Sequence, residues 1–506
     1  MNILLVYPQI PKSIIQFTDM VKVTGRKSAF PPLGLLTVAS LLPENWNKKL
    51  VDLNTAELKD SDIEWADYAF ISAMNVQAES VRDVIKYLNE RKLKIVAGGP
   101  LFTHEYMEYE GIDHFVLNEG EITLPMFLKD LENGTPQKIY QSKEFADITE
   151  TPRAMWELAD LDDYLYAVLQ YSRGCPYLCD FCDVTALFGR RPRTKTPEQI
   201  IKELDHINSF GTIEHILFAD DNLIGNKNLL KKELLPALIE WRKNNRYAPG
   251  FATQVTINLA DDRELAELML EAGFRHILVG IESIDEESLI AMKKKQNTRR
   301  NILDNIKYLQ DIGFTITGTF IVGLDTDKPT VFDDVINFIQ ESGIVLSIIN
   351  ILKAPPGTEL YERMKRENRL LETFKFGEDA TNVIPKMGIE ELRDGYKKII
   401  ERIYSPESVY NRSVKYFEAS KSYKVRFPLR RKVRLTDILT ALKIIFKLGI
   451  LDKNKKYFWK LVFHIAKKNH NYLDQAVLFS LILYQYSILR EENIMEINKT
   501  AHAAFG

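Results

Sequence analysis

The chain is 506 residues long, carries a formal net charge of −3 and is 45% apolar, which predicts two to four globular domains. The stretch closest to a membrane-spanning helix, 476–489, is interrupted by Ser480, Gln485 and Ser487, so we expect no such helix. The near-neutral charge gives no indication of a nucleic-acid partner. Residues 1–10 lack the basic segment and long apolar core of a signal peptide, so we expect a cytoplasmic protein.

Residues 1–145 alternate strand-like and helix-like patterns, which predicts a Rossmann-like domain. We expect strands at 2–8, 49–53, 68–74, 94–100 and 114–121, and helices at 33–42 and 79–90. Such alternation is typical of a parallel sheet covered on both faces by helices, and ligands of such sheets bind at the carboxyl ends of the strands. In this chain those ends carry Asn75, Val76, Gln77, Gly98, Gly99, Glu119 and Gly120.

A second strand–helix array follows a connector at 140–166, and together they predict a domain at 146–365. We expect six strands, at 167–174, 215–221, 250–257, 276–283, 315–324 and 347–354. Amphipathic helical stretches separate them, for example 197–207, 262–273 and 299–313. Repeated units of this kind favour a barrel or an open doubly wound sheet, and six are too few for an eight-stranded barrel.

Residues 366–506 have a helical pattern with a basic bias, which predicts a third, helical domain. Residues 411–470 contain seventeen Lys and Arg against three acidic residues, a local balance of +14, so the rest of the chain carries −17. Lys443 and Lys447 lie among apolar residues, and Trp459 and Phe463 are nearby. This composition suits a helix that lies on an anionic bilayer. The alternative is a solvated helical subdomain that packs on the barrel.

The only three cysteines, Cys175, Cys179 and Cys182, lie within eight residues in the spacing C-x3-C-x2-C. An odd, clustered set of thiols in a reducing compartment indicates a metal site and not a disulfide framework. A zinc site or inert cysteines are the alternatives, but zinc sites usually take a second, distant pair of ligands, which this chain lacks. An iron–sulfur cluster with one iron not bound by protein fits three thiolates.

This motif, with Phe181 before the last cysteine, resembles that of the radical S-adenosylmethionine superfamily. The resemblance implies a partial (β/α)6 barrel and a 4Fe–4S cluster on the three cysteines, with S-adenosyl-L-methionine bound to the open iron. It also implies that the cofactor is held by groups at the strand ends, namely Asp220, Asp221, Asn222, Gln254 and Glu282. Helix caps and sheet-end turns are the alternative explanation for these residues. No catalytic residue is identified.

The N-terminal domain resembles the cobalamin-binding domain of the cobalamin-dependent subclass, through residues 30–40, the GGP at 98–100 and the NEGE at 118–121. Residues 8–16 contain no histidine, so the D-x-H-x-x-G motif that ligates cobalt in many relatives is missing. We therefore expect cobalamin without a histidine ligand, its lower face near 75–77 and its tail along 98–99. The alternative for Gly98 and Gly99 is a simple tight turn.

Stretches at 219–226, 251–265, 293–301 and 395–412 resemble the hopanoid 2-methylase-like group of this family. The resemblance implies methylation of an unactivated carbon of a lipid-like (hopanoid or isoprenoid) or other apolar substrate. It also implies a reductant such as ferredoxin or flavodoxin. A lipid substrate would explain peripheral membrane contact through 411–470. The competing functions are radical ring or carbon–carbon bond formation without methyl transfer, and a non-enzymatic cofactor-binding sensor.

Overall fold

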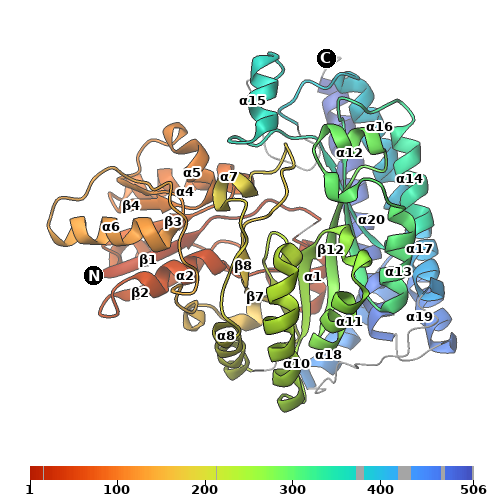
Figure 1. Cartoon of the computed structure of the whole chain (residues 1–506), viewed down its shortest axis with the longest axis horizontal. Helices are drawn as coiled ribbons and strands as arrows, with labels where there is room; N and C mark the ends of the chain where they lie inside the picture. Colours follow the sequence, from red (N-terminus) through yellow and green to blue (C-terminus); the bar gives the residue numbers. More distant parts are fainter. Residues whose placement is uncertain (15, 212, 372–380, 420–434, 469–472, 504–506) are drawn as a thin grey trace.

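The structure, a computed structural model, describes the chain except residues 15, 212, 372–380, 420–434, 469–472 and 504–506, and it describes no side chains at 468 or 493–503. Two six-stranded parallel sheets and a group of C-terminal helices make up the molecule (Figure 1). Within the described residues, no helix is long and apolar enough to cross a membrane.

The N-terminal sheet has the order β2-β1-β3-β4-β5-β6. Its strands are β1 (Asn2–Tyr7), β2 (Asn47–Asp52), β3 (Tyr68–Ser72), β4 (Lys94–Gly98), β5 (His114–Val116) and β6 (Ile139–Tyr140). Successive side chains of a strand point to opposite faces, so Ile3 and Leu5 pack under α2 (Leu33–Leu41) and α6 (Gly120–Glu132). Leu4 and Val6 pack under α3 (Asp60–Trp65), α4 (Ala78–Glu90) and α5 (Pro100–Glu105). The predicted sheet with two covered faces is confirmed.

The second sheet, which we call the barrel, has the order β14-β13-β12-β11-β10-β7. Its strands are β7 (Ala167–Leu169), β10 (His215–Phe218), β11 (Gly250–Val255), β12 (Phe274–Glu282), β13 (Thr315–Val322) and β14 (Leu346–Ile351). The helices around it include α8 (Pro197–Ser209), α10 (Leu235–Asn244), α11 (Arg263–Ala272), α13 (Ile302–Ile312) and α14 (Val331–Ser342). The six predicted strand–helix units are therefore all present.

The first predicted barrel strand, 167–174, is wrong in its second half. The chain leaves the barrel after Leu169, and β8 (Ser172–Arg173) instead pairs antiparallel with β9 (Arg193–Thr194) in a separate ribbon. The physical cause is Asp220, whose carboxylate accepts hydrogen bonds from the backbone N–H groups of Tyr171 and Ser172. Those two donors are therefore taken by a side chain and do not extend the barrel ladder.

Two predicted strands of the N-terminal sheet also end earlier than expected. The strand predicted at 94–100 ends at Gly98, because Gly99 has a positive φ of 92° and Pro100 begins α5. The strand predicted at 114–121 ends at Val116, and Gly120 begins α6. Gly99 requires glycine, since a Cβ atom there would lie 2.6 Å from the Ser72 hydroxyl.

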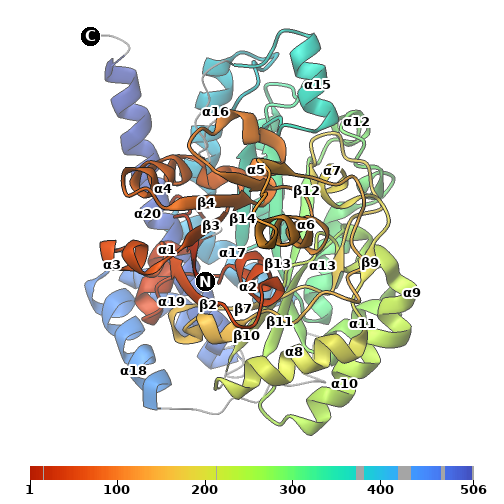
Figure 2. The same cartoon turned by 90° about the vertical axis from the view of Figure 1, so that its left-hand side faces the viewer.

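The C-terminal helices pack on the outer layer of the barrel (Figures 1 and 2). They are α15 (Glu359–Arg366), α16 (Ile389–Ile403), α17 (Pro406–Ala419), α18 (Leu435–Ile444), the π-helical η10 (Ile445–Leu451), α19 (Lys455–Lys468) and α20 (Leu473–Ala503). The barrel core continues into them without a break; for example, the Tyr486 hydroxyl on α20 bonds both the N–H and the carbonyl of Ser347 on β14. The boundaries at 145/146 and 365/366 stay predictions.

Candidate cofactor site

The three cysteines lie on one loop between β8 and α7 (Val184–Phe188), at the carboxyl end of the barrel strands. None forms a disulfide and all are partly buried. Backbone hydrogen bonds hold the loop in place: Cys175 N–H donates to Gly189 O at 3.3 Å, Asp180 N–H to Met292 O at 3.1 Å, and Leu360 N–H to Asp180 O at 2.8 Å. The loop is thus held by a contact at its own C-terminal end, by Met292 of the barrel and by Leu360 on α15.

The cysteine loop does not have the geometry of a single-ion site. Among the residues that the structure describes, no three His, Cys, Asp or Glu side chains gather around one point as a zinc ion would require. A 4Fe–4S cluster takes its thiolates on different irons and does not need such convergence. The donor set, three thiols on one loop with no fourth protein ligand beside them among the described residues, fits a cluster with one open iron.

A buried lysine, Lys294, lies beside the cysteine loop. Its ammonium bonds Glu282 Oε1 at 2.8 Å and sits 5.8 Å above the Phe181 ring. Burial alone would lower the pKa of Lys294, but Glu282, Cys179 and Cys182 outweigh burial and raise it. Burial raises the pKa of Cys182 to about 12. Burial therefore disfavours the Cys182 thiolate unless a metal binds it, and Lys294 supplies a positive charge beside the loop.

Several buried polar atoms around the loop lack a protein partner within the described part of the chain. They are Asn222 Nδ2, Thr253 Oγ1, Gln296 Oε1 and Asn297 Oδ1. Gln296 also donates to Cys179 Sγ at 3.5 Å. Native proteins leave few buried polar groups unsatisfied, so such a cluster indicates a bound ligand. Lys294 and Gln296 were missed as site residues, although both lie in the stretch 293–301 that carries the family resemblance.

The aspartates at the end of β10 bind the chain that leads into the cysteine loop. Asp220 accepts from Tyr171 N–H and from the Ser172 N–H and hydroxyl, and burial raises its pKa to about 7. Asp221 accepts from Gly174 N–H at 3.2 Å, and burial raises its pKa to about 6. Both carboxylates therefore contact protein groups, and their expected cofactor contacts stay predictions.

The other predicted barrel residues lie at the same end of the strands. Asn222 Oδ1 accepts from Thr256 N–H at 3.3 Å, and Gln254 on β11 has an exposed side chain. Glu282 ends β12 with a positive φ of 63°, a strained conformation for a residue with a side chain. Its second oxygen accepts from Thr319 on β13 at 3.2 Å. Glu282 thus joins two strand ends to Lys294 and the cysteine loop.

The predicted residues of the N-terminal sheet line its carboxyl edge. Asn75, Val76 and Gln77 form one 3₁₀ turn, η1 (Asn75–Gln77), where Val76 is exposed and Gln77 is buried. Gln77 bonds Pro8 O and Met74 N–H, which joins the β1 and β3 ends. A Cβ atom on Gly98 would lie 2.5 Å from Val116 O, so this glycine is required by the sheet itself. Packing within the sheet accounts for Gly98 and the turn into α5 for Gly99, and a cobalamin contact at either residue stays a prediction.

His104, excluded as a ligand by its sequence context, lies between the two sheets. A Cβ atom on Gly357, in the loop after β14, would lie 2.7 Å from its ring, and Asp183 next to Cys182 is close enough to affect its pKa. Burial lowers the pKa of His104, and its Nε2 has no partner among the described residues. The sequence has no local signal for this placement, because the contacts come from residues about 80 and 250 positions away.

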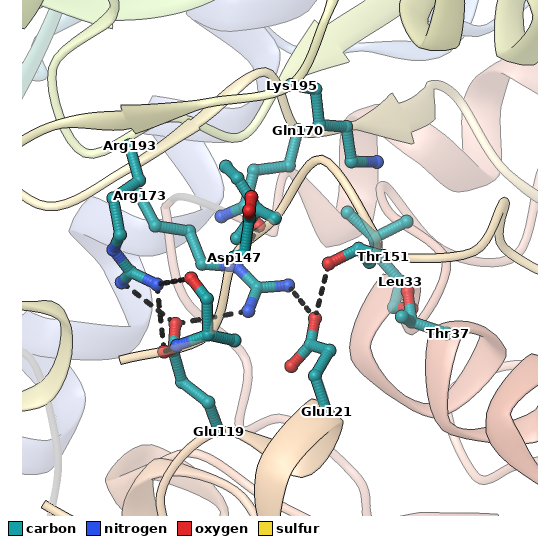
Figure 3. Close-up of polar contacts among 12 residues, drawn as sticks. Leu33, Thr37, Glu119, Glu121, Asp147, Thr151, Gln170, Arg173, Arg193 and Lys195 are labelled. Carbon is teal, nitrogen blue, oxygen red and sulfur yellow. Dashed lines mark hydrogen bonds and ion pairs between the residues drawn. The ribbon is translucent and has the colours of Figure 1, made fainter. Parts of the chain in front are cut away.

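Glu119 and Gly120 lie at the start of α6, which faces the base of the cysteine loop (Figure 3). Both Glu119 carboxylate oxygens bond arginines of the β8–β9 ribbon, and Oε2 also accepts from Ala146 N–H. In the structure, Glu119 of the NEGE motif therefore joins the N-terminal sheet to the β8–β9 ribbon of the other half of the molecule. The expected role of Glu119 and Gly120 in binding a cofactor stays a prediction, and the observed contacts indicate a different one.

Comparison with known proteins assigns the three regions. The B12 binding domain family matches residues 21–128, the Radical SAM superfamily matches 169–339, and a domain of unknown function, DUF4070, matches 358–499. The solved structure of the cobalamin-dependent radical enzyme OxsB, with aqua-cobalamin and S-adenosylmethionine bound, has a TM-score of 0.62 at 14% identity, covering 100% of this chain and 81% of that one. At this identity the likeness shows the fold alone.

Two relatives match along nearly the whole chain. An uncharacterised methyltransferase of Synechocystis sp. is 35% identical over 501 residues, covering 97% of this chain and 93% of the relative. The hopanoid C-2 methylase of Rhodopseudomonas palustris is 33% identical over 502 residues, covering 97% and 94%. The chain therefore belongs to the cobalamin-dependent radical S-adenosylmethionine methyltransferases, in the group that contains hopanoid C-2 methylase, and its cofactors are a 4Fe–4S cluster, S-adenosyl-L-methionine and cobalamin.

Proposed function

We propose that this methyltransferase methylates an unactivated carbon of a hopanoid or related isoprenoid lipid. The observation that carries the proposal is the 33% identity with hopanoid C-2 methylase, which extends over 97% of the chain and includes the C-terminal helices. A match confined to the barrel would indicate only the shared cofactor chemistry. A match through the peripheral helices supports a shared substrate class as well.

The arrangement of the two sheets supports transfer between two cofactors. When bound, the cluster, S-adenosyl-L-methionine and cobalamin supply the methyl group and the hydrogen-abstracting radical. The chain's own groups hold and shield them: the three cysteines would bind the cluster, Lys294 supplies compensating charge, and Asp220 and Asp221 hold the loop. The N-terminal sheet comes close to this loop at His104, whose ring lies beside Gly357 and is near enough to Asp183 to affect its pKa.

Enzymes of this family need a reductant, and a ferredoxin or flavodoxin is our proposal for it. Arg190 and Arg191 lie between α7 and β9, after the cysteine loop, and both side chains are exposed. Neither has an ion-pair partner in the part of the chain that the structure describes. Their backbone lies close to the start of the cysteine loop, because a Cβ atom on Gly174 would lie 3.1 Å from the carbonyl oxygen of Arg191. A basic surface there suits an acidic electron carrier.

Peripheral membrane contact is the second part of the proposal. The segment α18–η10 exposes large apolar side chains, with Lys443 and Lys447 beside them; the exposed set includes Leu435, Ile438, Leu439, Leu442, Phe446 and Leu451. Ile444 and Leu448, from the same expected surface, are buried instead. Phe463 on α19 is 64% exposed and stacks on Trp459. Exposed apolar residues with lysines suit an anionic bilayer. Lys421, Lys424, Arg426, Arg430, Arg431, Lys432 and Arg434 lie outside the described residues.

The apolar segment α18–η10 and the cysteine loop lie in different parts of the molecule. In Figures 1 and 2, α18 is at the bottom, and α7, which follows the cysteine loop, is in the upper half. Lys443 on α18 is close to Gly25, since its Nζ atom would lie 3.9 Å from a Cβ atom built on that glycine. Gly25 precedes residues 27–29, which bond the chain just before the amino end of β7, so α18 lies near that end of the barrel. Contact through α18 would therefore tether the enzyme to a membrane without forming the mouth of the site.

The lipid profile of cells with and without the gene tests the substrate proposal. We expect methylated hopanoids, or methylated lipids of another isoprenoid class, only in cells that contain the gene. A gene-dependent lipid that has lost hydrogen and gained no methyl group would support the alternative, which is ring or carbon–carbon bond formation. An unchanged lipid profile would overturn the lipid assignment.

A further inference from the structure

The cysteine loop is closed at its base by the two-residue ribbon of β8 and β9. Arg173 and Arg193 face each other in this ribbon, and residues 174–192 between them include all three cysteines. Gly174 has a positive φ of 95°, and a Cβ atom there would lie 2.9–3.1 Å from the carbonyl oxygens of Phe188, Gly189 and Arg191. The two ends of the loop are therefore in close contact beside Gly174, and a movement of the β8–β9 ribbon would move the whole cysteine loop.

Both arginines of the ribbon reach across to the N-terminal sheet (Figure 3). Arg193 binds Glu119 with two hydrogen bonds, both 2.9 Å, and Arg173 contacts the same carboxylate at 3.2 Å. Arg173 also bonds Glu121 Oε1 at 2.7 Å. We call these four residues, Glu119, Glu121, Arg173 and Arg193, the ion-pair cluster. Two positive charges that would repel each other across the ribbon are balanced by two negative charges from the start of α6.

The ion-pair cluster is largely buried, and most of its polar atoms have protein partners; Arg193 Nε has none among the described residues. The side chains of Glu119, Arg173, Glu121 and Arg193 are 2%, 12%, 13% and 18% exposed. Gln170 accepts from Arg173, Ala146 O accepts from Arg193, and Thr151 donates to Glu121. Ala146 and Thr151 belong to the segment that connects the two sheets, so the ion-pair cluster also binds this connecting segment. Buried, bidentate pairs of this kind fix one geometry, because a partner that moves leaves a charge unpaired.

We propose that the ion-pair cluster sets the position of the cobalamin-binding sheet relative to the cysteine loop, and that Arg173 and Arg193 are positioning residues for methyl transfer. Each cofactor is bound by its own half of the molecule. The ion-pair cluster is a polar link from the N-terminal sheet to the base of the cysteine loop. Weakening the ion-pair cluster should therefore leave each cofactor bound but change the position of cobalamin relative to the iron–sulfur cluster. The proposal rests on methyl transfer between the two halves and not on the lipid substrate.

The test compares Arg193→Gln and Glu121→Gln with wild type. Glu121→Gln keeps the shape and a hydrogen-bond acceptor for Arg173, so it is the milder change if Arg193→Gln fails to fold. Arg91→Gln is the matched control, because Arg91 pairs with Asp60 at an exposed site of the N-terminal domain. Iron and cobalamin content, 5′-deoxyadenosine formation and methylated product are measured for each variant. Hydrogen exchange of residues 141–166 is measured in the apoprotein.

In both cluster variants we expect wild-type iron and cobalamin content and unchanged 5′-deoxyadenosine formation. We expect methylated product to fall by about 10- to 100-fold, since a misplacement of ~1 Å can cost ~100-fold in rate. Exchange in 141–166 should rise more than ~10-fold in the apoprotein, where no cofactor is involved. The control should change none of these.

Three outcomes would overturn the proposal. If exchange in 141–166 and the ratio of 5′-deoxyadenosine to product stay at wild-type values, the cluster does not position the two halves. If the Glu121→Gln protein loses its iron, the ion-pair cluster only maintains the fold of the cysteine loop. If Arg91→Gln has the same effects, they are not specific. When the lipid is not the substrate, transfer of the methyl group to cobalamin replaces product as the readout, so the two proposals fail separately.

Discussion

The carboxylate of Asp220 illustrates how one buried residue positions the candidate site. It is 3% exposed and holds Tyr171 and Ser172, the residues that turn the chain out of the barrel towards Cys175. Asp220 lies at the strand end expected from the sequence, and its expected cofactor contact stays a prediction. Its hydrogen-bond partners precede it by 48 and 49 residues, so no local pattern could have revealed them.

The stability of the apoprotein should depend on pH through Asp220. Burial raises its folded-state pKa to about 7, whereas an unfolded aspartate titrates near ~3.9. A raised pKa favours folding below the unfolded value, and this contribution is lost as the pH rises through the folded value. We therefore expect the free energy of unfolding of the apoprotein to fall between about pH 4 and pH 7, and Asp220→Asn to flatten this dependence. Denaturant titrations over this range measure it, and an identical slope in both proteins would refute it.

Cys179 should be indispensable for the cluster. Anaerobically reconstituted protein should hold about four irons per chain, as one 4Fe–4S cluster requires. Cys179→Ala should abolish iron loading and 5′-deoxyadenosine formation, because two thiolates cannot hold the cluster. Leu178→Ala is the matched control, since this neighbour in the loop is 45% exposed. Iron analysis and product chromatography provide the measurements; stoichiometric zinc without iron in anaerobically purified protein would contradict the assignment.

At the scale of elements, the sequence predicts strands and helices well and their ends less well. The apolar run of β1 and the periodicity of α4 are local properties, and both elements were predicted within two residues of their observed bounds. The end of β7 and the role of the NEGE motif depend on distant partners. Glu119 meets Arg173 and Arg193 across 54 and 74 residues, so its local sequence shows a glycine-containing turn and nothing of the arginines.

The carboxyl edge of the N-terminal sheet should bind cobalamin without a histidine ligand to cobalt. The motivation is the absence of histidine from residues 8–16 after β1. Electron paramagnetic resonance of the cob(II)alamin form should show no nitrogen splitting from an axial imidazole. His104→Ala is the informative control, because the Nε2 atom of His104 is buried and has no partner among the described residues. A nitrogen splitting that this variant removes would overturn the prediction and identify the ligand.

Across the whole molecule, only part of the excess of Lys and Arg in residues 411–470 lies on an exposed surface that the structure describes. The basic residues that the structure describes include Arg412, which is fully buried and bonds Ile403 O, so this residue belongs to the core. The exposed apolar side chains of α18–η10 are the more direct indication of a membrane surface. Sequence periodicity could not show which face of this segment is exposed, because η10 is π-helical and departs from the regular helical repeat.

Binding to anionic vesicles should depend on this surface. Each Lys near such a bilayer contributes about 1 kcal/mol, and salt screens the effect within a Debye length. Neutralising Lys443, Lys447, Lys455, Lys456 and Lys460 together should therefore weaken binding strongly and leave iron and cobalamin content unchanged. The matched control neutralises five lysines elsewhere on the exposed surface: Lys86, Lys92, Lys129, Lys143 and Lys232. Vesicle sedimentation at two salt concentrations measures it, and no binding at low salt would remove the support for a membrane surface.

Transfer of a labelled methyl group tests the central claim most directly. Anaerobically reconstituted enzyme is supplied with a reductant, cobalamin, a hopanoid lipid and S-adenosyl-L-methionine that carries the label in its methyl group. We expect labelled, methylated lipid whose formation requires cobalamin and is accompanied by 5′-deoxyadenosine. Formation of 5′-deoxyadenosine with a lipid that has lost hydrogen and gained no label would contradict it.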